Sequence, residues 1–414
     1  MKNPEQNSDA FSSFSRRGFL KGAAVLAAAS KSEPLAAATG QIVAYVGAYT
    51  DATARSQASG DAGAALYIYD LNPVDGSLTR RTAIKDYPSP SSLALDPKNK
   101  FLYAVNEISN FNGTTTGSVT AFAIQPNGDL KFLNVVSSQG GGPAFLSVDP
   151  SGKWVLAANY GGGSVAVLPI KADGSLGDAT DMKMITGPLG PHVAQDSPPY
   201  DFADSGHDAP HAHMSVTDPA GNYVLVCDLG TDRVFSYKFD KTAGTLTDNG
   251  FVQANPGAGP RHLDFHPNGR WVYVINEEAS TLDYMNYDAS SGSLTLIQTI
   301  SSLPDAWEGT NYPSEIHVTA DGQFVYALNR FHNTIAQFAI DPGSGMPTRI
   351  REFWTRGDYP RHFGIEPNGN FLYVCHSNSH NITSFGVDRG TGTLNFTGKY
   401  TGVFNPSKIV FVAL

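Results

Sequence analysis

Residues 257–277, GAGPRHLDFHPNGRWVYVINE, decide the fold of this chain. They contain a short strand after a proline, a turn at HPNG and a second, apolar strand, which is the pattern of a β-hairpin. The basic pair Arg261 and His262 opens the hairpin, and Asn276 and Glu277 close it. Because the two ends of an antiparallel hairpin lie side by side, this unit places charged side chains together at one edge.

The same unit recurs along the chain, and its copies align with one another without insertions or deletions. The other copies are PSSLALDPKNKFLYAVNE from Pro90, PAFLSVDPSGKWVLAANY from Pro143, AHMSVTDPAGNYVLVCDL from Ala212, PSEIHVTADGQFVYALNR from Pro313 and PRHFGIEPNGNFLYVCHS from Pro360. By subtraction, successive units lie 53, 69, 48, 53 and 47 residues apart, measured between the turn positions Pro97, Pro150, Pro219, Pro267, Ala320 and Pro367. An all-β repeat of about fifty residues is typical of a β-propeller.

Each unit predicts a four-stranded sheet. After the hairpin comes an alternating run, such as RVFSYKFD from Arg233, and then a weaker fourth strand, such as TLNFTGKY from Thr393. Six units are complete, and the chain ends supply a seventh: NPSKIVFVAL matches a first strand, and QIVAYVGAYT, AALYIYDLN and SLTRRTAIK match the other three. The sequence therefore predicts an all-β, seven-bladed propeller over residues 39–414. Its closing blade joins one C-terminal strand to three N-terminal strands, which leaves no open edge.

Residues 1–38 have the pattern of an export signal. Twin arginines, Arg16 and Arg17, precede a short apolar run, and an A-x-A cleavage site ends at Ala38. The arginine pair favours a twin-arginine signal over an ordinary secretory signal, and the apolar run is too short for a membrane anchor. We therefore expect recognition by the twin-arginine export machinery, a periplasmic or secreted location, and no stable membrane insertion after cleavage.

The composition agrees with many short strands joined by turns. The chain holds 42 glycines and 26 prolines, and only 16% of its residues are charged. The net charge of -10 argues against nucleic acid as a partner, because phosphate binding needs a basic face. The two cysteines, Cys227 and Cys375, lie in apolar runs of distant units, so we expect two small buried residues rather than a disulfide.

Two columns of the repeat face one another at one mouth of the predicted propeller, where first strands begin and second strands end. The first column is Ser91, Ala144, His213, Arg261, Ser314, Arg361 and Ser407. The second is Glu107, Tyr160, Leu229, Glu277, Arg330 and Ser377, with Tyr49 in the closing blade. These columns diverge while turn and core positions stay alike, and charged groups gathered at a concave mouth indicate a binding site. A solvated ring of ion pairs is the alternative.

A family resemblance is carried by PHAHMSVTDPAGNYVLVCDLGTDRVFSYKFD, from Pro210, and by the opening stretch. These segments resemble the lactonase family of seven-bladed propellers, which includes the propeller-type 6-phosphogluconolactonases and the fungal carboxymuconate lactonising enzyme. The resemblance covers essentially the whole chain after the export signal. It implies catalytic residues at His213, Arg261, Glu277 and a further arginine, either Arg330 or Arg361. Candidate substrate-binding residues nearby are His211, Asp228, His262, Glu107, Tyr160 and His362.

The implied activity is the hydrolysis of a small lactone. Opening the ring requires an activated water, donors for the oxyanion and a proton for the leaving alkoxide. We expect Glu277 or His213 to activate the water, and Arg261 with the later arginine to hold the oxyanion or a carboxylate. No G-x-S-x-G elbow is present, so we expect no acyl-enzyme, and we expect no cofactor. Export favours an unphosphorylated, sugar-type lactone.

Three other hypotheses stay open. A muconate-type cycloisomerase would use the same pocket, with a carboxylate or imidazole protonating a double bond while arginines hold carboxylates. A metal site is conceivable at His207, His211 and His213, with His192 nearby, although no acidic ligand stands at a familiar spacing. A propeller that only binds a partner is the third.

One insertion distinguishes the chain. Residues 187–213, GPLGPHVAQDSPPYDFADSGHDAPHAH, account for the 69-residue interval, and we expect them to fold over the rim beside His213. On the next strand we expect Asp228 to orient His213, and Arg233 to be structural.

Overall fold

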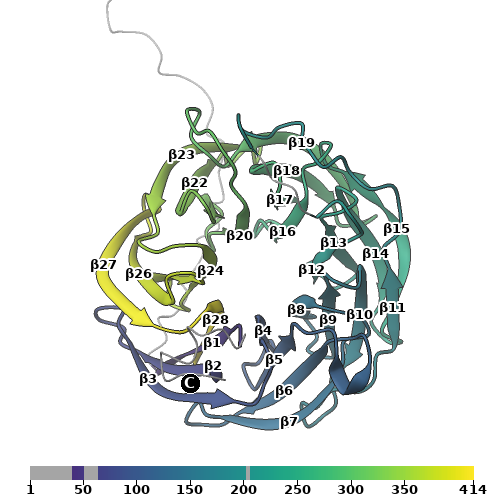
Figure 1. Cartoon of the computed structure of the whole chain (residues 1–414), viewed down its shortest axis with the longest axis vertical. Helices are drawn as coiled ribbons and strands as arrows, with labels where there is room; N and C mark the ends of the chain where they lie inside the picture. Colours follow the sequence, from purple (N-terminus) through teal and green to yellow (C-terminus); the bar gives the residue numbers. More distant parts are fainter. Residues whose placement is uncertain (1–39, 51–63, 202–205) are drawn as a thin grey trace, which may run out of the picture. The chain divides into compact units, whose positions relative to one another are not determined.

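The protein is described by a computed structural model that covers residues 40–50, 64–201 and 206–414. The expected export signal, residues 1–38, lies outside these described residues. From residue 40 onward, the described chain forms seven four-stranded antiparallel sheets arranged in a ring (Figure 1). Within these ranges no helix is long and apolar enough to cross a membrane. The predicted seven-bladed propeller is confirmed.

The blades follow the chain in order. The closing sheet is β28 (Pro406–Ala413), β1 (Ile42–Ala48), β2 (Ala64–Leu71) and β3 (Leu78–Lys85). The second sheet is β4 (Ser92–Leu95), β5 (Phe101–Asn106), β6 (Ser118–Ile124) and β7 (Leu130–Ser137). The third is β8 (Pro143–Val148), β9 (Trp154–Asn159), β10 (Ser164–Pro169) and β11 (Asp181–Met184). The fourth is β12 (Ala212–Thr217), β13 (Tyr223–Asp228), β14 (Arg233–Asp240) and β15 (Thr245–Gln253). The fifth sheet is β16 (Pro260–Phe265), β17 (Trp271–Asn276), β18 (Thr281–Asp288) and β19 (Ser293–Ser301). The sixth is β20 (Pro313–Val318), β21 (Phe324–Asn329), β22 (Thr334–Ile340) and β23 (Pro347–Trp354). The seventh is β24 (Pro360–Ile365), β25 (Phe371–His376), β26 (Asn381–Asp388) and β27 (Thr393–Gly402).

The ring closes as the repeat predicts. β28 pairs antiparallel with β1, from Ile42 opposite Ala413 to Ala48 opposite Pro406. The pairing satisfies backbone groups that two chain ends would otherwise leave open, so no exposed edge separates the first blade from the last.

The turn between first and second strands follows from its sequence. In the blade of β8 and β9, Asp149 precedes Pro150, and its Oδ1 accepts hydrogen bonds from the backbone N–H groups of Lys153 and Trp154, both at 2.8 Å. Gly152 adopts a φ of 69°, a left-handed conformation that favours glycine. The D-P-x-G pattern therefore encodes a tight turn and sets the register of the hairpin that follows.

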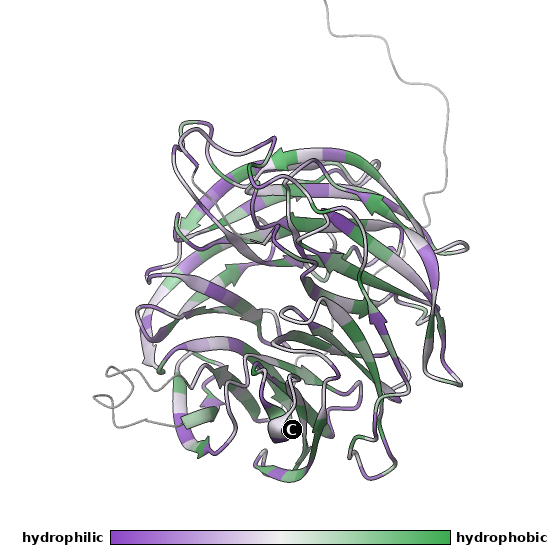
Figure 2. Cartoon of the chain, turned by 45° about the vertical axis from the view of Figure 1, so that its right-hand side comes forward, coloured by the Kyte–Doolittle hydropathy of each residue, from purple (hydrophilic) through white to green (hydrophobic). Residues whose placement is uncertain are grey.

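The core lies between neighbouring sheets. Strands such as β17 and β21 are buried along their whole length, and the hydrophobic colour of Figure 2 falls mainly on strands while the connecting loops are largely hydrophilic. Cys227 and Cys375 are both buried and free, as expected from the sequence. In five of the seven blades a second-strand tyrosine also donates to a glycine carbonyl of the next blade: Tyr45 to Gly128 (2.8 Å), Tyr103 to Gly174 (3.0 Å), Tyr273 to Gly345 (2.7 Å), Tyr326 to Gly392 (2.6 Å) and Tyr373 to Gly76 (3.0 Å).

The described parts of the insertion between β11 and β12, residues 187–201 and 206–211, lie along the predicted rim. They contact loops that end second strands or begin first strands, which confirms the expected position of the insertion. His207 binds Asp232 in a buried ion pair with 3.0 Å between Nε2 and Oδ1. The backbone contacts are Gly190 N to Gly230 O (2.9 Å), Gln195 N to Pro256 O (2.9 Å) and Gly309 N to Pro199 O (2.7 Å).

Candidate functional site

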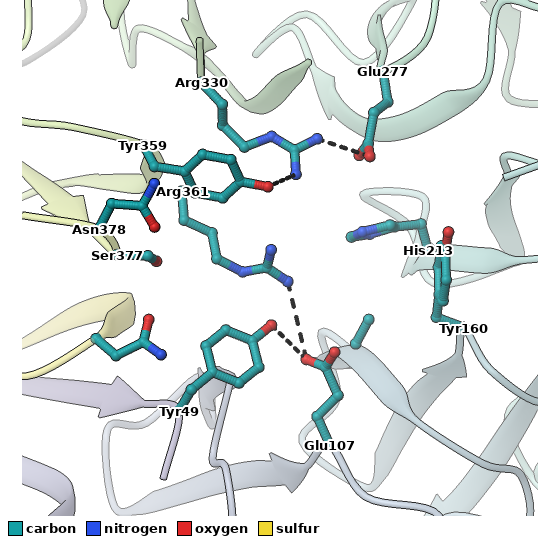
Figure 3. A pocket seen from close by; sticks show the side chains of 12 residues that line it. Tyr49, Glu107, Tyr160, His213, Glu277, Arg330, Tyr359, Arg361, Ser377 and Asn378 are labelled. Atoms are coloured by element: carbon teal, nitrogen blue, oxygen red, sulfur yellow. Dashed lines mark hydrogen bonds and ion pairs between the residues drawn. The ribbon is translucent and has the colours of Figure 1, made fainter. Parts of the chain in front are cut away.

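A pocket of about 520 Å³ lies at the rim where first strands begin and second strands end (Figure 3). Its lining draws on both predicted columns, because the geometry of the hairpins brings those strand ends together. The lining residues are Tyr49, Glu107, Ala144, Tyr160, His213, Glu277, Arg330, Tyr359, Arg361, Ser377, Asn378 and Asn405.

Glu277 holds two arginines. It follows the last residue of β17, and its Oε2 lies 2.6 Å from Arg261 Nε while its Oε1 lies 2.8 Å from Arg330 Nη2. Burial alone would raise the pKa of this carboxyl, but Arg330 and Arg261 lower it below the ordinary value. Glu277 is therefore ionised at neutral pH, with each oxygen already engaged by a guanidinium.

Arg261 lies behind Glu277 rather than in the pocket lining. Its side chain is 2% exposed, and Nη1 donates to the backbone carbonyl of Ser314. Burial lowers the pKa of Arg261 to about 10, so the group remains cationic at neutral pH. Arg330 and Arg361 are the arginines of the lining, and Arg261 contacts the pocket through Glu277; its expected role in catalysis stays a prediction.

Arg330 and Arg361 occupy different surroundings, as Figure 3 shows. Arg330 donates from Nη1 to the hydroxyl of Tyr359 at 3.2 Å, in addition to its pair with Glu277. Arg361 points into the middle of the pocket, with Nη2 4.0 Å from Glu107 Oε2 and its guanidinium 5.0 Å from the ring centre of Tyr49. Arg361 is thus the less tightly paired of the two.

His213 faces the pocket from the side opposite Arg361 (Figure 3). Its ring packs edge-on against Tyr160 and His262, with centroids 5.5 and 4.9 Å away, and its Nδ1 has no hydrogen-bond partner among the described residues. Burial, reinforced by the cationic Arg261, lowers the pKa of His213 well below its ordinary value. The imidazole is therefore neutral near pH 7 and keeps a lone pair that can accept a proton.

Comparison with known proteins assigns the family. The model of the lactonase family, described as a 7-bladed beta-propeller, matches residues 43–411. This chain belongs to the lactonase family.

Among its relatives, the 6-phosphogluconolactonase of Bacillus subtilis is 34% identical over 304 residues, 73% of this chain and 79% of the relative. The 6-phosphogluconolactonase of Formosa agariphila is 30% identical over 310 residues, 73% and 80% of the two chains. The solved structure of a periplasmic gluconolactonase from Pseudomonas aeruginosa is 29% identical, with a TM-score of 0.78 over 90% of this chain and 99% of the other.

Besides Arg261, two further predicted residues of this lactonase-family chain, His211 and Asp228, lie outside the pocket lining. His211 stacks on Tyr160 at 4.2 Å between ring centroids and binds Asp208 through Nε2 at 2.9 Å. Asp228 accepts through Oδ1 from the N–H (2.9 Å) and hydroxyl (2.7 Å) of Thr231. No hydrogen bond within the described chain joins Asp228 to His213, so the expected orienting role is wrong: the carboxylate caps a turn. Arg233 lies over the ring of Phe251 at 4.1 Å, in keeping with a structural role.

His262 and His362 are buried beneath the pocket instead of lining it. Both contact Glu315, a residue that the sequence analysis did not select: His262 Nδ1 lies 2.9 Å from Oε1, and His362 Nε2 lies 3.1 Å from Oε2. The two histidines are thus outside the lining and in contact with Glu315, and their expected substrate-binding role stays a prediction. A signal existed, because Glu315 stands one position after the first rim column in the repeat.

Three lining residues were also missed: Tyr359, Asn378 and Asn405. Tyr359 and Asn405 each precede the first proline of a unit, and both adopt left-handed backbone conformations, with φ of 58° and 43°. Asn378 follows directly after the second column. All three residues lie within two positions of one of the two predicted columns, so the neighbours of those columns in the repeat could have indicated them as lining residues.

One group in the described residues has potential metal ligands close together: Glu315, His317 and His362 offer ligand atoms within 4.8 Å of one another. It lies apart from the histidines expected from the sequence, of which His207 is paired with Asp232 and His211 with Asp208.

Proposed function

We propose that the protein hydrolyses an unphosphorylated sugar-type lactone, an aldonolactone, in the rim pocket after export. The observation that carries this proposal is the convergence of a neutral His213 with Arg330 and Arg361 on one cavity of about 520 Å³. A proton acceptor facing two fixed cations matches the needs of ester hydrolysis, in which a water loses a proton while negative charge grows on the carbonyl oxygen.

His213 is the proposed general base. It takes a proton from water as the water oxygen attacks the lactone carbonyl carbon, and the carbonyl electron pair moves onto oxygen. Glu277 is less suited to this step, because both of its oxygens face guanidinium groups and its pKa is lowered. Its role is to hold Arg330 in place.

Arg330 and Arg361 receive the oxyanion through charge-assisted hydrogen bonds. When the oxyanion collapses, the ring carbon–oxygen bond breaks, and the leaving alkoxide takes the proton from His213. The enzyme returns to its starting state, and the product is an open-chain hydroxy acid. The carboxylate formed remains next to the same two arginines until it leaves.

The lining favours an uncharged, hydroxyl-rich substrate. Its charged side chains are two carboxylates and two guanidiniums, Glu107, Glu277, Arg330 and Arg361, so the formal charges cancel. Within the lining each guanidinium has a carboxylate partner, and Asn378, Asn405 and Glu107 offer hydrogen bonds to hydroxyls. The relative from P. aeruginosa is a periplasmic gluconolactonase, which supports an exported enzyme of this type.

A titration screen tests the function. The protein spanning residues 39–414 is mixed with aldonolactones, their 6-phosphates and muconolactones, and acid release is followed at constant pH above the spontaneous rate. We expect release from unphosphorylated aldonolactones and its loss in His213→Ala. Preference for the phosphates would overturn the substrate assignment, and ring closure of a muconate without aldonolactone hydrolysis would establish the cycloisomerase instead. Absence of any turnover would leave a binding module.

Export has its own test. Replacing Arg16 and Arg17 by lysine is expected to keep the protein in the cytoplasm, measured by cell fractionation, because the twin arginines are the proposed recognition element. Unchanged export of the double variant would rule out the twin-arginine route.

A further inference from the structure

A second ring of side chains lies directly below the rim column. It consists of the next residue along each of the seven units: Ser92, Phe145, Met214, His262, Glu315, His362 and Lys408. Four neighbouring members of this ring carry the chemistry, on β16, β20, β24 and β28. None of these four appears in the pocket lining.

Glu315 is the centre of this ring. Its side chain is 3% exposed, and its carboxylate faces His262 and His362 at 2.9 and 3.1 Å and Lys408 Nζ at 3.6 Å. Burial would raise the pKa of Glu315, but His262, Lys408 and His362 hold it well below the ordinary value. The carboxylate is ionised and therefore only accepts hydrogen bonds.

The ionised carboxylate fixes the proton of His262. Burial lowers the pKa of His262 to about 4, so the ring is neutral and carries one proton, which must sit on Nδ1 to donate to Glu315. Nε2 then presents a lone pair, and Arg261 Nη1 lies 3.4 Å from it. The chain of contacts runs from Glu315 through His262 to Arg261, and from Arg261 to Glu277 in the pocket.

The same contacts argue against a metal ion at Glu315, His317 and His362. The backbone N–H of Ile409 donates to His362 Nδ1 at 3.3 Å, so in the neutral ring the proton sits on Nε2, the atom that faces Glu315. A metal ligand needs a lone pair at that atom. The ammonium group of Lys408 also occupies the space beside the carboxylate.

We propose that Glu315 is a positioning residue for the lactonase site: by fixing the tautomer of His262 it supplies Arg261 with an acceptor, and Arg261 in turn holds Glu277 against Arg330. The proposal rests on the proposed function for its activity readout. Glu315 touches neither the pocket nor the substrate, so its effect reaches the reaction only through the orientation of side chains.

The activity test uses isosteric changes. Glu315→Gln replaces the charged acceptor of the His262 Nδ1 proton by an uncharged amide, so we expect kcat to fall roughly 10- to 100-fold with KM within about twofold. Asp264→Asn is the matched control, because Asp264 is a carboxylate on β16 that accepts from Val318 N at 2.8 Å and stands outside the contact chain; we expect wild-type kcat. Folding of each variant is checked by its melting temperature.

A second pair of variants separates positioning from packing. The amide of His262→Gln can donate to Glu315 and accept from Arg261, whereas His262→Leu fills space and does neither. We expect the glutamine variant to retain at least about ten times more kcat than the leucine variant. Equal kcat values in the two, or a wild-type kcat in folded Glu315→Gln, would overturn the proposal.

The tautomer is measured independently of turnover. In protein labelled with ¹⁵N-histidine, His262 should show a protonated Nδ1 in the wild type and an altered Nδ1 signal in Glu315→Gln, with the signal assigned from His262→Gln. An unchanged signal would overturn the inference even if the enzyme is an aldonolactonase, and a failure of the aldonolactone screen leaves this measurement intact. Stoichiometric metal in the wild type, lost in Glu315→Gln, would replace the positioning role by a metal site.

Discussion

Two carboxylates of this molecule, Glu277 and Glu315, are each contacted by nitrogen-bearing side chains, yet their surroundings differ. Glu277 is 13% exposed, lines the pocket and is paired with two guanidiniums. Glu315 is 3% exposed and is contacted by two imidazoles and one ammonium. Arginine keeps its charge at every working pH, whereas the imidazoles are neutral donors whose tautomer the carboxylate selects. We call the pocket lining around Glu277 the open level and the buried ring around Glu315 the closed level. The open level thus presents charged groups to the substrate, and the closed level orients the side chains of the open level.

The largest effect is expected at His213, whose ring contacts both levels. His213→Ala should lower kcat/KM by about 10²- to 10⁴-fold, because the reaction loses its proton acceptor. The measurement is aldonolactone hydrolysis by constant-pH titration, with the melting temperature as the check on folding. A folded His213→Ala variant with wild-type kcat/KM would show that His213 is not the general base.

The next effect distinguishes the two arginines of the pocket. Arg330→Met should lower kcat by about 10²- to 10³-fold, since it removes a fixed donor for the oxyanion and frees Glu277. Arg361→Met removes the more loosely paired cation and should mainly raise KM. The measurement is kcat and KM of both variants by steady-state kinetics. Identical losses in kcat would mean that pairing with Glu277 does not give Arg330 a different role from Arg361.

The pH profile tests the neutral state of His213. Because its pKa in the folded protein lies well below the ordinary 6.5, the base form persists as pH falls through 6.5. The acid limb of kcat/KM is therefore expected below pH 6.5, and His213→Gln should lack this limb in its residual activity. A limb centred above pH 6.5 would contradict the assignment of His213 as a desolvated base.

The smallest effect concerns stability at the closed level. The pKa of His262 falls from 6.5 to about 4 on folding, so between these values the unfolded chain binds the extra proton and the folded one does not. The free energy of unfolding is therefore highest above pH 6.5 and decreases as pH falls toward 4, by roughly 3 kcal/mol. Melting temperatures of the wild type should drop across this window more steeply than those of His262→Gln. Parallel curves would show that His262 does not titrate with unfolding.

Much of the fold was predictable because each blade repeats one hairpin. The D-P-x-G turn, the apolar second strand and the matching chain ends determine the number of blades and the closure. The two rim columns were predictable for the same reason: strand ends at one rim bring residues as distant in sequence as His213 and Arg361 to one pocket.

The depth of each side chain was not predictable from alternation. Arg261 occupies the same bulge position as His213 and Arg361, yet those two line the pocket while Arg261 lies behind Glu277, so neither alternation nor the bulge predicts its depth. The surroundings of Glu315 come from three other blades, and the sequence of one strand does not reveal which side chains face it. The left-handed backbone of Tyr359 and Asn405 likewise redirects side chains that a strand pattern leaves unassigned.

The closing strand β28 has a consequence for how this enzyme is made. Residues 406–413 leave the ribosome after all the other strands, so six sheets can be complete while β1 still waits for its partner. Lys408, the ammonium beside Glu315, arrives on the same strand. Until residues 406–413 have left the ribosome, one edge of β1 is therefore unpaired and the charge cluster lacks Lys408. A product truncated before residue 406 would keep that edge of β1 open to pairing with other chains.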